Sequence, residues 1–318
     1  MDRPALYITR LLPPPVLEAI PQQYRLLTSP SDDPPTVTEL RQGFAEADAV
    51  ICTLSDRIDA SLLSNATRLK IIANYAVGYN NIDVVAAAQR GIVVSNTPDV
   101  LTEATADLTW ALLLAVARRV AEGDRWVRTG TWPGWRPTQM LGGEVSGKTL
   151  GIIGMGRIGQ AVARRAVGFG MPVIYAGRHA VVSPPGAAWT QRSLPEVLSE
   201  SDFLSLHVPL TDATYHLIGR QELPAMKPTS FLLNTSRGPV IDETALVAAL
   251  EARTIAGAGL DVYEQEPVVS SRLLTLPNVV LLPHLGSATL ETRVRMGLVC
   301  VKNVAAVLDG RTAPNQVR

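Results

Sequence analysis

The sequence predicts two α/β domains with a cleft between them, each domain containing a doubly wound parallel sheet that has helices on both faces. Three observations support this fold class. Short β-rich runs alternate with helical stretches along the chain, as parallel sheets require. The length of 318 residues corresponds to about two domains. The hydrophobic content of 47% is sufficient for globular cores.

The first series of elements predicts a small sheet. The runs expected to form strands are 5–9, 49–54, 69–74 and 92–95, with Pro- and Ser-rich turns between them. The segment 96–99 then forms a break, and Asp99 is a suitable N-cap for a long helix to about residue 120. Residues 123–143, rich in Trp, Gly and Pro, are interpreted as an exposed loop that crosses between the two units.

A second series begins at Lys148. A strand at 149–153, a glycine-rich turn and a helix at 157–169 are followed by strands expected at 173–176, 203–208, 230–234, 256–260 and 279–282. These six strands predict one doubly wound sheet of the nucleotide-binding type. The final helix, 287–308, precedes no strand and is expected to pack on the first unit. We therefore predict domains of residues 1–98 plus 289–318 and of residues 99–288.

Composition excludes several classes of protein. The 29 basic and 29 acidic residues cancel, which argues against a nucleic-acid or membrane-surface partner. The longest apolar run, Leu108–Ala117, is too short to cross a bilayer and is expected to be a helix buried between domains or subunits. Two cysteines give neither a disulfide framework nor a zinc site, and no metal-ligand cluster appears. We expect a cytoplasmic protein with no bound metal.

A glycine motif opens the helix of the second series. Gly154, Gly156 and Gly159 fit the GxGxxG pattern between a predicted strand and a predicted helix. Their roles would be a tight turn, close approach of the backbone to a pyrophosphate, and close packing of helix on sheet. An ordinary glycine-rich turn is the alternative. The strand–turn–helix context favours a dinucleotide site.

The end of the next strand indicates the choice of dinucleotide. A sheet that binds NAD would place Asp or Glu there to hold the ribose hydroxyls, whereas an arginine suits a 2′-phosphate. The sequence has Arg178 and no acid at that point. A solvated surface arginine is the alternative interpretation.

Three further side chains follow successive strands of the second series. Arg237 is placed to bind a carboxylate. Glu266 lies among the acids after the next strand, and His284 follows the last strand. Each residue alone could be structural, but together they can converge on one site. His207 is expected to pack, and His179 and His216 to lie on the surface. Gly78 follows a strand of the first unit and could let backbone amides point at an anion, although on spacing alone the segment is only a turn.

Six long motifs spread along almost the whole chain are typical of one protein family: AVGYNNID, VLTEATADLTWALLLAVARR, GIIGMGRIG, NTSRGPVID, GLDVYEQEP and LLPHLGSAT. By these motifs the chain resembles the D-isomer-specific 2-hydroxyacid dehydrogenase family. Through TLSDRID, the AGR at 176–178 and the loop with Trp135 it is most similar to the glyoxylate/hydroxypyruvate reductase branch. The resemblance implies a Rossmann-like cofactor domain (99–288) and a flavodoxin-like substrate-binding domain (1–98 plus 289–318).

The same resemblance implies roles for individual residues. Arg237 would bind the substrate carboxylate, Glu266 would pair with the histidine, and His284 would be the acid/base. The expected substrate contacts are Leu54, Val77, Gly78, Arg237 and Trp135. The expected cofactor contacts are Gly154, Met155, Gly156, Arg157, Ile158, Gly159, Gly177, Arg178, His179, Pro209, Thr235, Asp261, His284 and Gly286. Asp261 is expected at the nicotinamide amide.

Three functions remain open at this point. The first is a reductase that converts glyoxylate and hydroxypyruvate to glycolate and D-glycerate, preferring NADPH and also able to use NADH. The second is another D-2-hydroxyacid dehydrogenase with a different substrate, and the third is a nucleotide-sensing interaction protein on the same fold. A homodimer is expected through the helix at 108–117 and the following Trp-rich loop, and the resemblance implies that Trp135 reaches the neighbour's active site.

Overall fold

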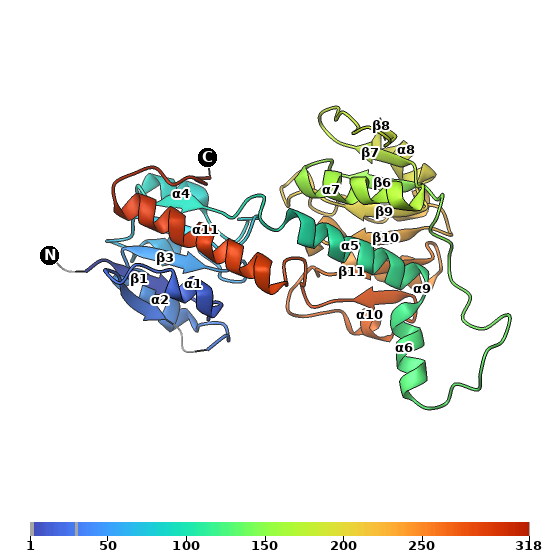
Figure 1. Cartoon of the computed structure of the whole chain (residues 1–318), viewed down its shortest axis with the longest axis horizontal. Helices are drawn as coiled ribbons and strands as arrows, with labels where there is room; N and C mark the ends of the chain where they lie inside the picture. The colour runs from blue at the N-terminus through green and yellow to red at the C-terminus, as the bar shows by residue number, and fades with distance from the viewer. Residues whose placement is uncertain (1–2, 29–30, 318) are drawn as a thin grey trace. The chain divides into compact units, whose positions relative to one another are not determined.

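The computed structural model describes residues 3–28 and 31–317, and the chain divides into two compact units (Figure 1). Unit 1 is Met1–Leu101 with Ser287–Arg318, and unit 2 is Thr102–Gly286. Each unit has one sheet, and every strand pair in both sheets is parallel. The predicted α/β class with two parallel sheets is confirmed.

The sheet of unit 1 has the strand order β2-β1-β3-β4-β5 among the described residues. Its strands are β1 (Ala5–Ile8), β2 (Arg25–Thr28), β3 (Ala49–Cys52), β4 (Ile71–Asn74) and β5 (Val93–Ser95). This is the flavodoxin-like order, in which the chain changes direction between β1 and β3. Strand β2 was not predicted, because it lies at the sheet edge with three of its four residues exposed and lacks an apolar run.

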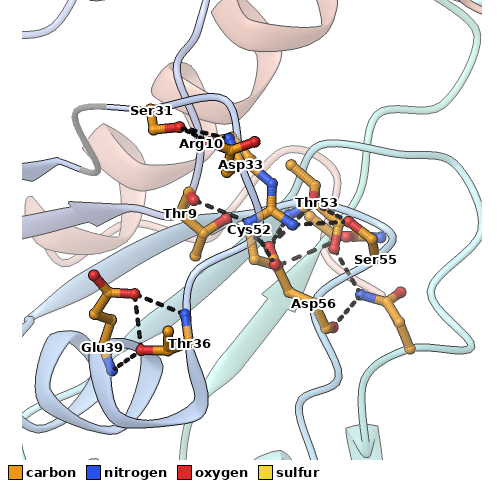
Figure 2. Close-up of polar contacts among 12 residues, drawn as sticks. Thr9, Arg10, Ser31, Asp33, Thr36, Glu39, Cys52, Thr53, Ser55 and Asp56 are labelled. Carbon is orange, nitrogen blue, oxygen red and sulfur yellow. Dashed lines mark hydrogen bonds and ion pairs between the residues drawn. The ribbon is translucent and has the colours of Figure 1, made fainter. Parts of the chain in front are cut away.

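Five helices cover this sheet within the described ranges: α1 (Pro14–Glu18), α2 (Val37–Glu46), α3 (Ala60–Leu63), α4 (Val84–Gln89) and α11 (Leu290–Leu308). Helix α2 begins with a capping box in which Thr36 and Glu39 each accept from the other's backbone N–H (Figure 2). Helix α11 packs on β3, β4, β5 and α1. Its Gly297 lies so close to Val16 that a Cβ would stand 2.4 Å from that side chain. Residues from both ends of the chain therefore complete one core.

Unit 2 contains a sheet with the order β12-β11-β10-β9-β6-β7-β8 in the described part of the chain. The strands are β6 (Leu150–Ile153), β7 (Val173–Ala176), β8 (Trp189–Gln191), β9 (Phe203–Leu206), β10 (Phe231–Asn234), β11 (Gly257–Leu260) and β12 (Val279–Leu281). From β8 to β11 this is the doubly wound order of dinucleotide-binding sheets, with the change of direction between β6 and β9. The unpredicted strand is β8, a short and largely exposed edge strand.

The larger helices of unit 2 are α5 (Thr102–Ala117), α6 (Val120–Arg128), α7 (Arg157–Ala166), α8 (Leu194–Glu200), α9 (Glu243–Glu251) and α10 (Ser271–Thr275). Short 3-10 turns occur at η1 (Val167–Phe169), η2 (Leu223–Ala225) and η3 (Gly238–Val240). Helix α5 lies beside α7 and against β10 and β11 (Figure 1). The Trp110 indole N–H donates to the Val162 carbonyl at 3.0 Å, which fixes α5 on α7.

Three predictions about this region are wrong. Helix α5 begins at Thr102, so Asp99, which has a φ of 70°, is not its N-cap. The long helix stops at Ala117, because Arg119 takes a left-handed conformation with a φ of 54°, and the predicted loop begins as helix α6. The remaining loop starts and ends inside unit 2 and therefore does not cross between units.

The apolar run 108–117 is largely buried within its own unit, where Leu112 and Leu113 are 1% and 0% exposed. The helix itself is therefore not the large exposed apolar surface that the run suggested. In the described ranges, none of the helices combines the length and the apolar character that crossing a bilayer requires. Both cysteines are buried free thiols.

Candidate active site

The glycine turn between β6 and α7 has the geometry that the GxGxxG pattern predicts. Gly154 has a φ of 97°, and a Cβ there would stand 2.6 Å from the His207 carbonyl oxygen. A Cβ on Gly159 would stand 2.3 Å from the Gly154 carbonyl oxygen. Both positions therefore require glycine, one for the turn and one for the packing of α7 on the sheet.

Gly156 differs from the other two glycines because a Cβ there would meet nothing within 4 Å. It is the N-cap of α7, and no side chain caps the helix. Helix α7 has ten residues, so the positive end of its dipole lies at this glycine turn. This arrangement fits the pyrophosphate of a dinucleotide.

The end of β7 lies directly beside the glycine turn, since the Gly154 N–H donates to the Ala176 carbonyl at 2.9 Å. Gly177 follows, and the Gln191 side-chain amide holds its carbonyl at 2.8 Å. Arg178 and His179 are both exposed. Among the described residues the Arg178 guanidinium has no hydrogen-bond or ion-pair partner, so it is available to an anionic ligand.

The loop that carries Arg237 is fixed by its own chain. The Asn234 side chain accepts from the Ser236 N–H at 3.0 Å and donates to the Arg237 carbonyl at 2.9 Å, closing a turn directly after β10. Next to it, Gly238 packs against the loop after β11, where a Cβ would stand 1.8 Å from the Tyr263 carbonyl oxygen. A glycine at this position brings the Arg237 loop and the Glu266 loop together.

His284 and Glu266 form a hydrogen-bonded pair. His284 Nδ1 lies 2.8 Å from Glu266 Oε2, and Glu266 Oε1 accepts from the Tyr263 N–H at 3.1 Å. The His284 backbone is left-handed, with a φ of 56°, and its N–H donates to the Asp261 carbonyl at 3.0 Å. The unusual backbone and the carboxylate together set the direction of the imidazole ring. In the described ranges, its Nε2 contacts no hydrogen-bonding partner.

Asp261 has a positioning role that its motif did not reveal. Its side chain is 1% exposed, and its two oxygens accept from the N–H groups of Leu285 at 2.6 Å and Gly286 at 2.8 Å. Thr105 of α5 donates to the Gly286 carbonyl at 2.9 Å. The turn that follows His284 is therefore held from β11 and from α5.

Burial and neighbouring charges perturb the pKa values of these groups. Burial would raise the pKa of Glu266, but the hydrogen bond and charge of His284, the Tyr263 N–H and the charge of Arg237 hold it below its usual value. Burial lowers the pKa of Arg237, against the effect of Glu266. Burial also raises the pKa of Asp261, although the bonds from Leu285 and Gly286 oppose the rise. Perturbed ionisable groups gathered at strand ends are typical of functional sites.

In unit 1, the Val77–Gly78 turn follows β4 and is held by two asparagines. The Asn96 amide donates to the Val77 carbonyl and the Asn74 amide to the Gly78 carbonyl, both at 2.8 Å. With both carbonyls fixed, the N–H groups of Val77 and Gly78 have no acceptor in the described part of the chain. The turn is a ready anion cradle. Sequence reasoning missed Asn74 and Asn96, because nothing in their motifs indicates where the amides point.

The other predicted residues lie as follows. Thr235 is 8% exposed and its hydroxyl lies 2.9 Å from that of Thr109. Pro209 is exposed after β9, and Trp135 is 81% exposed in the loop after α6. Leu54 is half-buried and lies two residues after the end of β3.

Two of the remaining histidines are also explained by their contacts. His207 bonds to the Ser205 hydroxyl at 2.8 Å, and burial lowers its pKa to about 3, so it packs as a neutral side chain. His216 keeps 32% of its side chain exposed, as a surface residue would, and its Nε2 lies 2.8 Å from Glu264 Oε1.

Comparisons with known proteins agree with this geometry. The sequence profile described as D-isomer specific 2-hydroxyacid dehydrogenase, NAD binding domain, matches residues 110–286. A glyoxylate reductase of Thermococcus litoralis is 49% identical, over 99% of this chain and 97% of its own. A crystal structure of a Thermus thermophilus protein has a TM-score of 0.92 at 47% identity, covering 99% of this chain and 100% of its own.

A further solved structure contains ligands. It is an NADPH-dependent glyoxylate/hydroxypyruvate reductase from Sinorhizobium meliloti in complex with NADP and malonate. It has a TM-score of 0.86 and 37% identity, covering 99% of this chain and 97% of its own. Each relative spans nearly the full length of this chain, so the similarity includes both units.

Proposed function

This chain belongs to the D-isomer specific 2-hydroxyacid dehydrogenases, which makes it an NAD(P)-dependent oxidoreductase, and on this premise we propose that it reduces glyoxylate to glycolate and hydroxypyruvate to D-glycerate. The observation that carries the proposal is the His284–Glu266 pair, with its 2.8 Å bond at the end of the cofactor sheet. Its free ring nitrogen is suited to proton transfer. The relatives named glyoxylate reductase support the substrate.

The cofactor fits the residues present. Gly154 to Gly159 and the uncapped start of α7 would hold the pyrophosphate, because a Cβ at Gly154 or Gly159 would collide with backbone while Gly156 faces open space. The contacts expected from Gly177 to His179, at Pro209, Thr235, Asp261 and at His284 to Gly286 belong to the same proposal. The reduced nicotinamide, when bound, supplies a hydride to the carbonyl carbon of the substrate.

The chain supplies the proton and the orientation. His284 donates from Nε2 to the carbonyl oxygen as charge develops there, while Glu266 holds Nδ1 and stabilises the protonated ring. Arg237 binds the substrate carboxylate and polarises the carbonyl, because its planar guanidinium can form two parallel bonds. The N–H groups of Val77 and Gly78 bind the same carboxylate. Positioning and electrostatics would account for most of the rate.

NADPH is the preferred cofactor in this proposal. Two features support it: no acid follows β7, and the exposed Arg178 guanidinium has no partner among the described residues. A bond from arginine to a 2′-phosphate is charge-assisted and worth about 1.5–3 kcal/mol, or roughly 10–150-fold in kcat/KM. NADH lacks only this contact, so it should remain a weaker alternative.

A homodimer is the proposed assembly. Helix α6 and the loop after it expose large apolar side chains, with Val127 at 59%, Trp135 at 81% and Leu141 at 67%. Apolar groups concentrated in one segment favour contact with another protein surface. We propose that this segment contacts a second copy and that Trp135 limits the size of the substrate bound there.

The test is turnover of the purified protein with NADPH and a panel of 2-oxo acids: glyoxylate, hydroxypyruvate, pyruvate and 2-oxobutanoate. We expect the highest kcat/KM with glyoxylate, then hydroxypyruvate, and D-glycerate as the hydroxypyruvate product. A preference for a larger acid would identify a different D-2-hydroxyacid dehydrogenase. NADPH binding without reduction of any acid would favour a nucleotide-sensing protein instead.

A further inference from the structure

A buried polar cluster in unit 1 joins the carboxyl ends of β1 and β3 (Figure 2). We call it the Asp56 cluster, and its members are Thr9, Arg10, Thr53, Ser55, Asp56 and Asn81. Asp56 is 2% exposed and Arg10 is 8% exposed, so the charges face each other away from water. A buried ion pair of this kind persists only when its remaining polar atoms are also satisfied.

The Asp56 carboxylate is fully engaged. Oδ1 pairs with Arg10 Nη1 at 3.0 Å. Oδ2 accepts from the Thr9 hydroxyl at 2.5 Å and from the Thr53 N–H at 2.7 Å. Since Thr9 follows β1 and Thr53 follows β3, one carboxylate ties two strand ends together.

The position of this cluster in the sheet is significant. In a sheet of order 2-1-3-4-5, ligands commonly bind outside the carboxyl ends of the strands where the chain changes direction, here between β1 and β3. The Arg10–Asp56 pair lies at this point and links the segment after β1 to the segment after β3. Ligand contacts in unit 1 are accordingly expected on the other side of β3, toward β4.

Leu54 is half-buried and lies between two members of the cluster in the sequence. Thr53, before it, bonds to Asp56, and Ser55, after it, accepts from Arg10 Nη2 at 3.1 Å. Strand β3 pairs with β4 in register Cys52 to Asn74, and the Tyr75 N–H donates to the Cys52 carbonyl. Leu54 and the Val77–Gly78 cradle therefore follow neighbouring strands at the same edge of the sheet.

Asn81 connects the two segments. Its side-chain amide donates to the carbonyls of Thr53 and Asp56, each at 3.1 Å. Asn81 lies three residues beyond Gly78, so the segment that leaves the cradle is anchored on the turn that carries Leu54. The cluster thereby fixes the position of an apolar side chain relative to an anion cradle.

We propose that Asp56 is a positioning residue that sets the substrate selectivity of the enzyme by fixing the turn at Thr53–Asp56 and with it Leu54. This inference rests on the proposed function. In the proposed function the cradle binds the carboxylate that every 2-oxo acid shares, and Leu54 contacts the part in which these acids differ. Loosening the turn should relax discrimination by size more than it weakens recognition of the carboxylate.

The matched control is Asp48, at the other end of the same strands. It is also buried, accepts from the Ala5 N–H at 2.8 Å and pairs with Arg68 at 3.2 Å. It therefore joins β1 to β3 just as Asp56 does, but before β3 begins. Asp48→Asn should also lower stability, by less than Asp56→Asn because the Arg68 side chain is half-exposed, and it should leave the selectivity unchanged.

The experiment measures the ratio of kcat/KM for glyoxylate to that for 2-oxobutanoate. Pockets discriminate single methylene groups by about 10–200-fold, so Asp56→Asn should lower the ratio by about tenfold. Asp48→Asn should keep the wild-type ratio. Leu54→Ala should lower the ratio by about as much as Asp56→Asn does. The variant that carries both substitutions should show no further decrease in the ratio, because both changes act through the Leu54 side chain. Thr9→Val, which removes a single bond to Asp56, should shift the ratio the same way by less.

The outcomes separate the two proposals. If Asp56→Asn and Thr9→Val both keep the ratio of the wild-type protein, and the wild-type protein reduces 2-oxo acids, then the positioning role is overturned while the proposed function stands. If Asp56→Asn does not fold, Thr9→Val decides by the same criterion. An equal fall of the ratio in Asp48→Asn would show that general destabilisation is the cause. A wild-type protein that reduces no 2-oxo acid would overturn the proposed function and this inference with it.

Discussion

Gly238 lies where the loop of Arg237 meets the loop of Glu266, and replacing it with alanine tests the proposed site directly. A Cβ at this position would stand 1.8 Å from the Tyr263 carbonyl oxygen, whereas Cβ atoms essentially never come closer than 3.0 Å. The difference between these distances requires the loops to separate by about 1.2 Å. The atoms in contact are backbone, so no side-chain rotation can relieve the overlap.

The expected effect on activity is large. A displacement of about 1 Å at a reacting group can cost roughly 10²-fold, so Gly238→Ala should lower kcat/KM for glyoxylate by about that factor. Overpacking costs about 1–3 kcal/mol, which lowers Tm by roughly 2–12 °C in a domain of this size. NADPH affinity should be retained, because the glycine turn after β6 is not part of the displaced contact.

Gly168 provides the control. It also lies in a 3-10 turn of unit 2, but a Cβ there would meet nothing within 4 Å. Gly168→Ala should keep kcat/KM and change stability by no more than about 0.5 kcal/mol. Steady-state kinetics and thermal melts of the two variants measure the contrast. Wild-type kcat/KM in Gly238→Ala would refute the reasoning, because the contact would then not set the position of Arg237 or Glu266.

Four further predictions concern the same site and the assembly. His284→Gln should lower turnover by roughly 10²–10⁴-fold while NADPH still binds, as single-turnover kinetics and fluorescence titration would show; near-normal turnover would exclude it as proton donor. Arg178→Ala should abolish most of the NADPH preference in kcat/KM, and a retained preference would place the 2′-phosphate elsewhere. The pKa of Glu266 is lowered in the folded protein, so its ionised form stabilises the fold above the unfolded pKa of about 4.3, and this contribution is lost as the pH falls through the lower folded pKa. Glu266→Gln should therefore unfold at lower denaturant concentration at pH 7, with a difference from wild type that narrows below about pH 4; a constant difference would contradict this. Sedimentation should show a dimer at assay concentration, and a monomer would contradict the interface proposed at Trp135.

The sequence predicted the buried strands well and the exposed elements poorly, for one physical reason. Strands such as β3 and β6 are buried throughout and are apolar along their whole length. Strands β2 and β8 lie at sheet edges with little burial, and α6 buries none of its residues, so no apolar pattern marked them. Hydrophobic periodicity reports burial, and elements without burial do not show it.

The candidate site shows a similar division. That Arg237, Glu266 and His284 come together was predictable, because the carboxyl ends of parallel strands meet at one edge of the sheet. The roles of Asp261 and Asn234 in fixing the adjacent turns were not, since a motif gives the order of residues and not the direction of a carboxylate or an amide. The requirement for glycine at 238 was equally invisible, because the clash is with a residue 25 positions later in the chain.

Unit 1 is formed by the first and the last segments of the chain, and this arrangement affects when it can fold during synthesis. Helix α11 covers β3 and β4, and the Tyr75 hydroxyl donates to the Arg293 carbonyl across 218 positions of sequence. The Val317 N–H donates to the Val94 carbonyl, so unit 1 also depends on residues near position 318. During translation, unit 2 is contiguous and can fold as soon as it leaves the ribosome, whereas unit 1 must wait with the apolar faces of its strands uncovered. Nascent chains that stall between residues 101 and 287 should therefore recruit chaperones through their N-terminal segment.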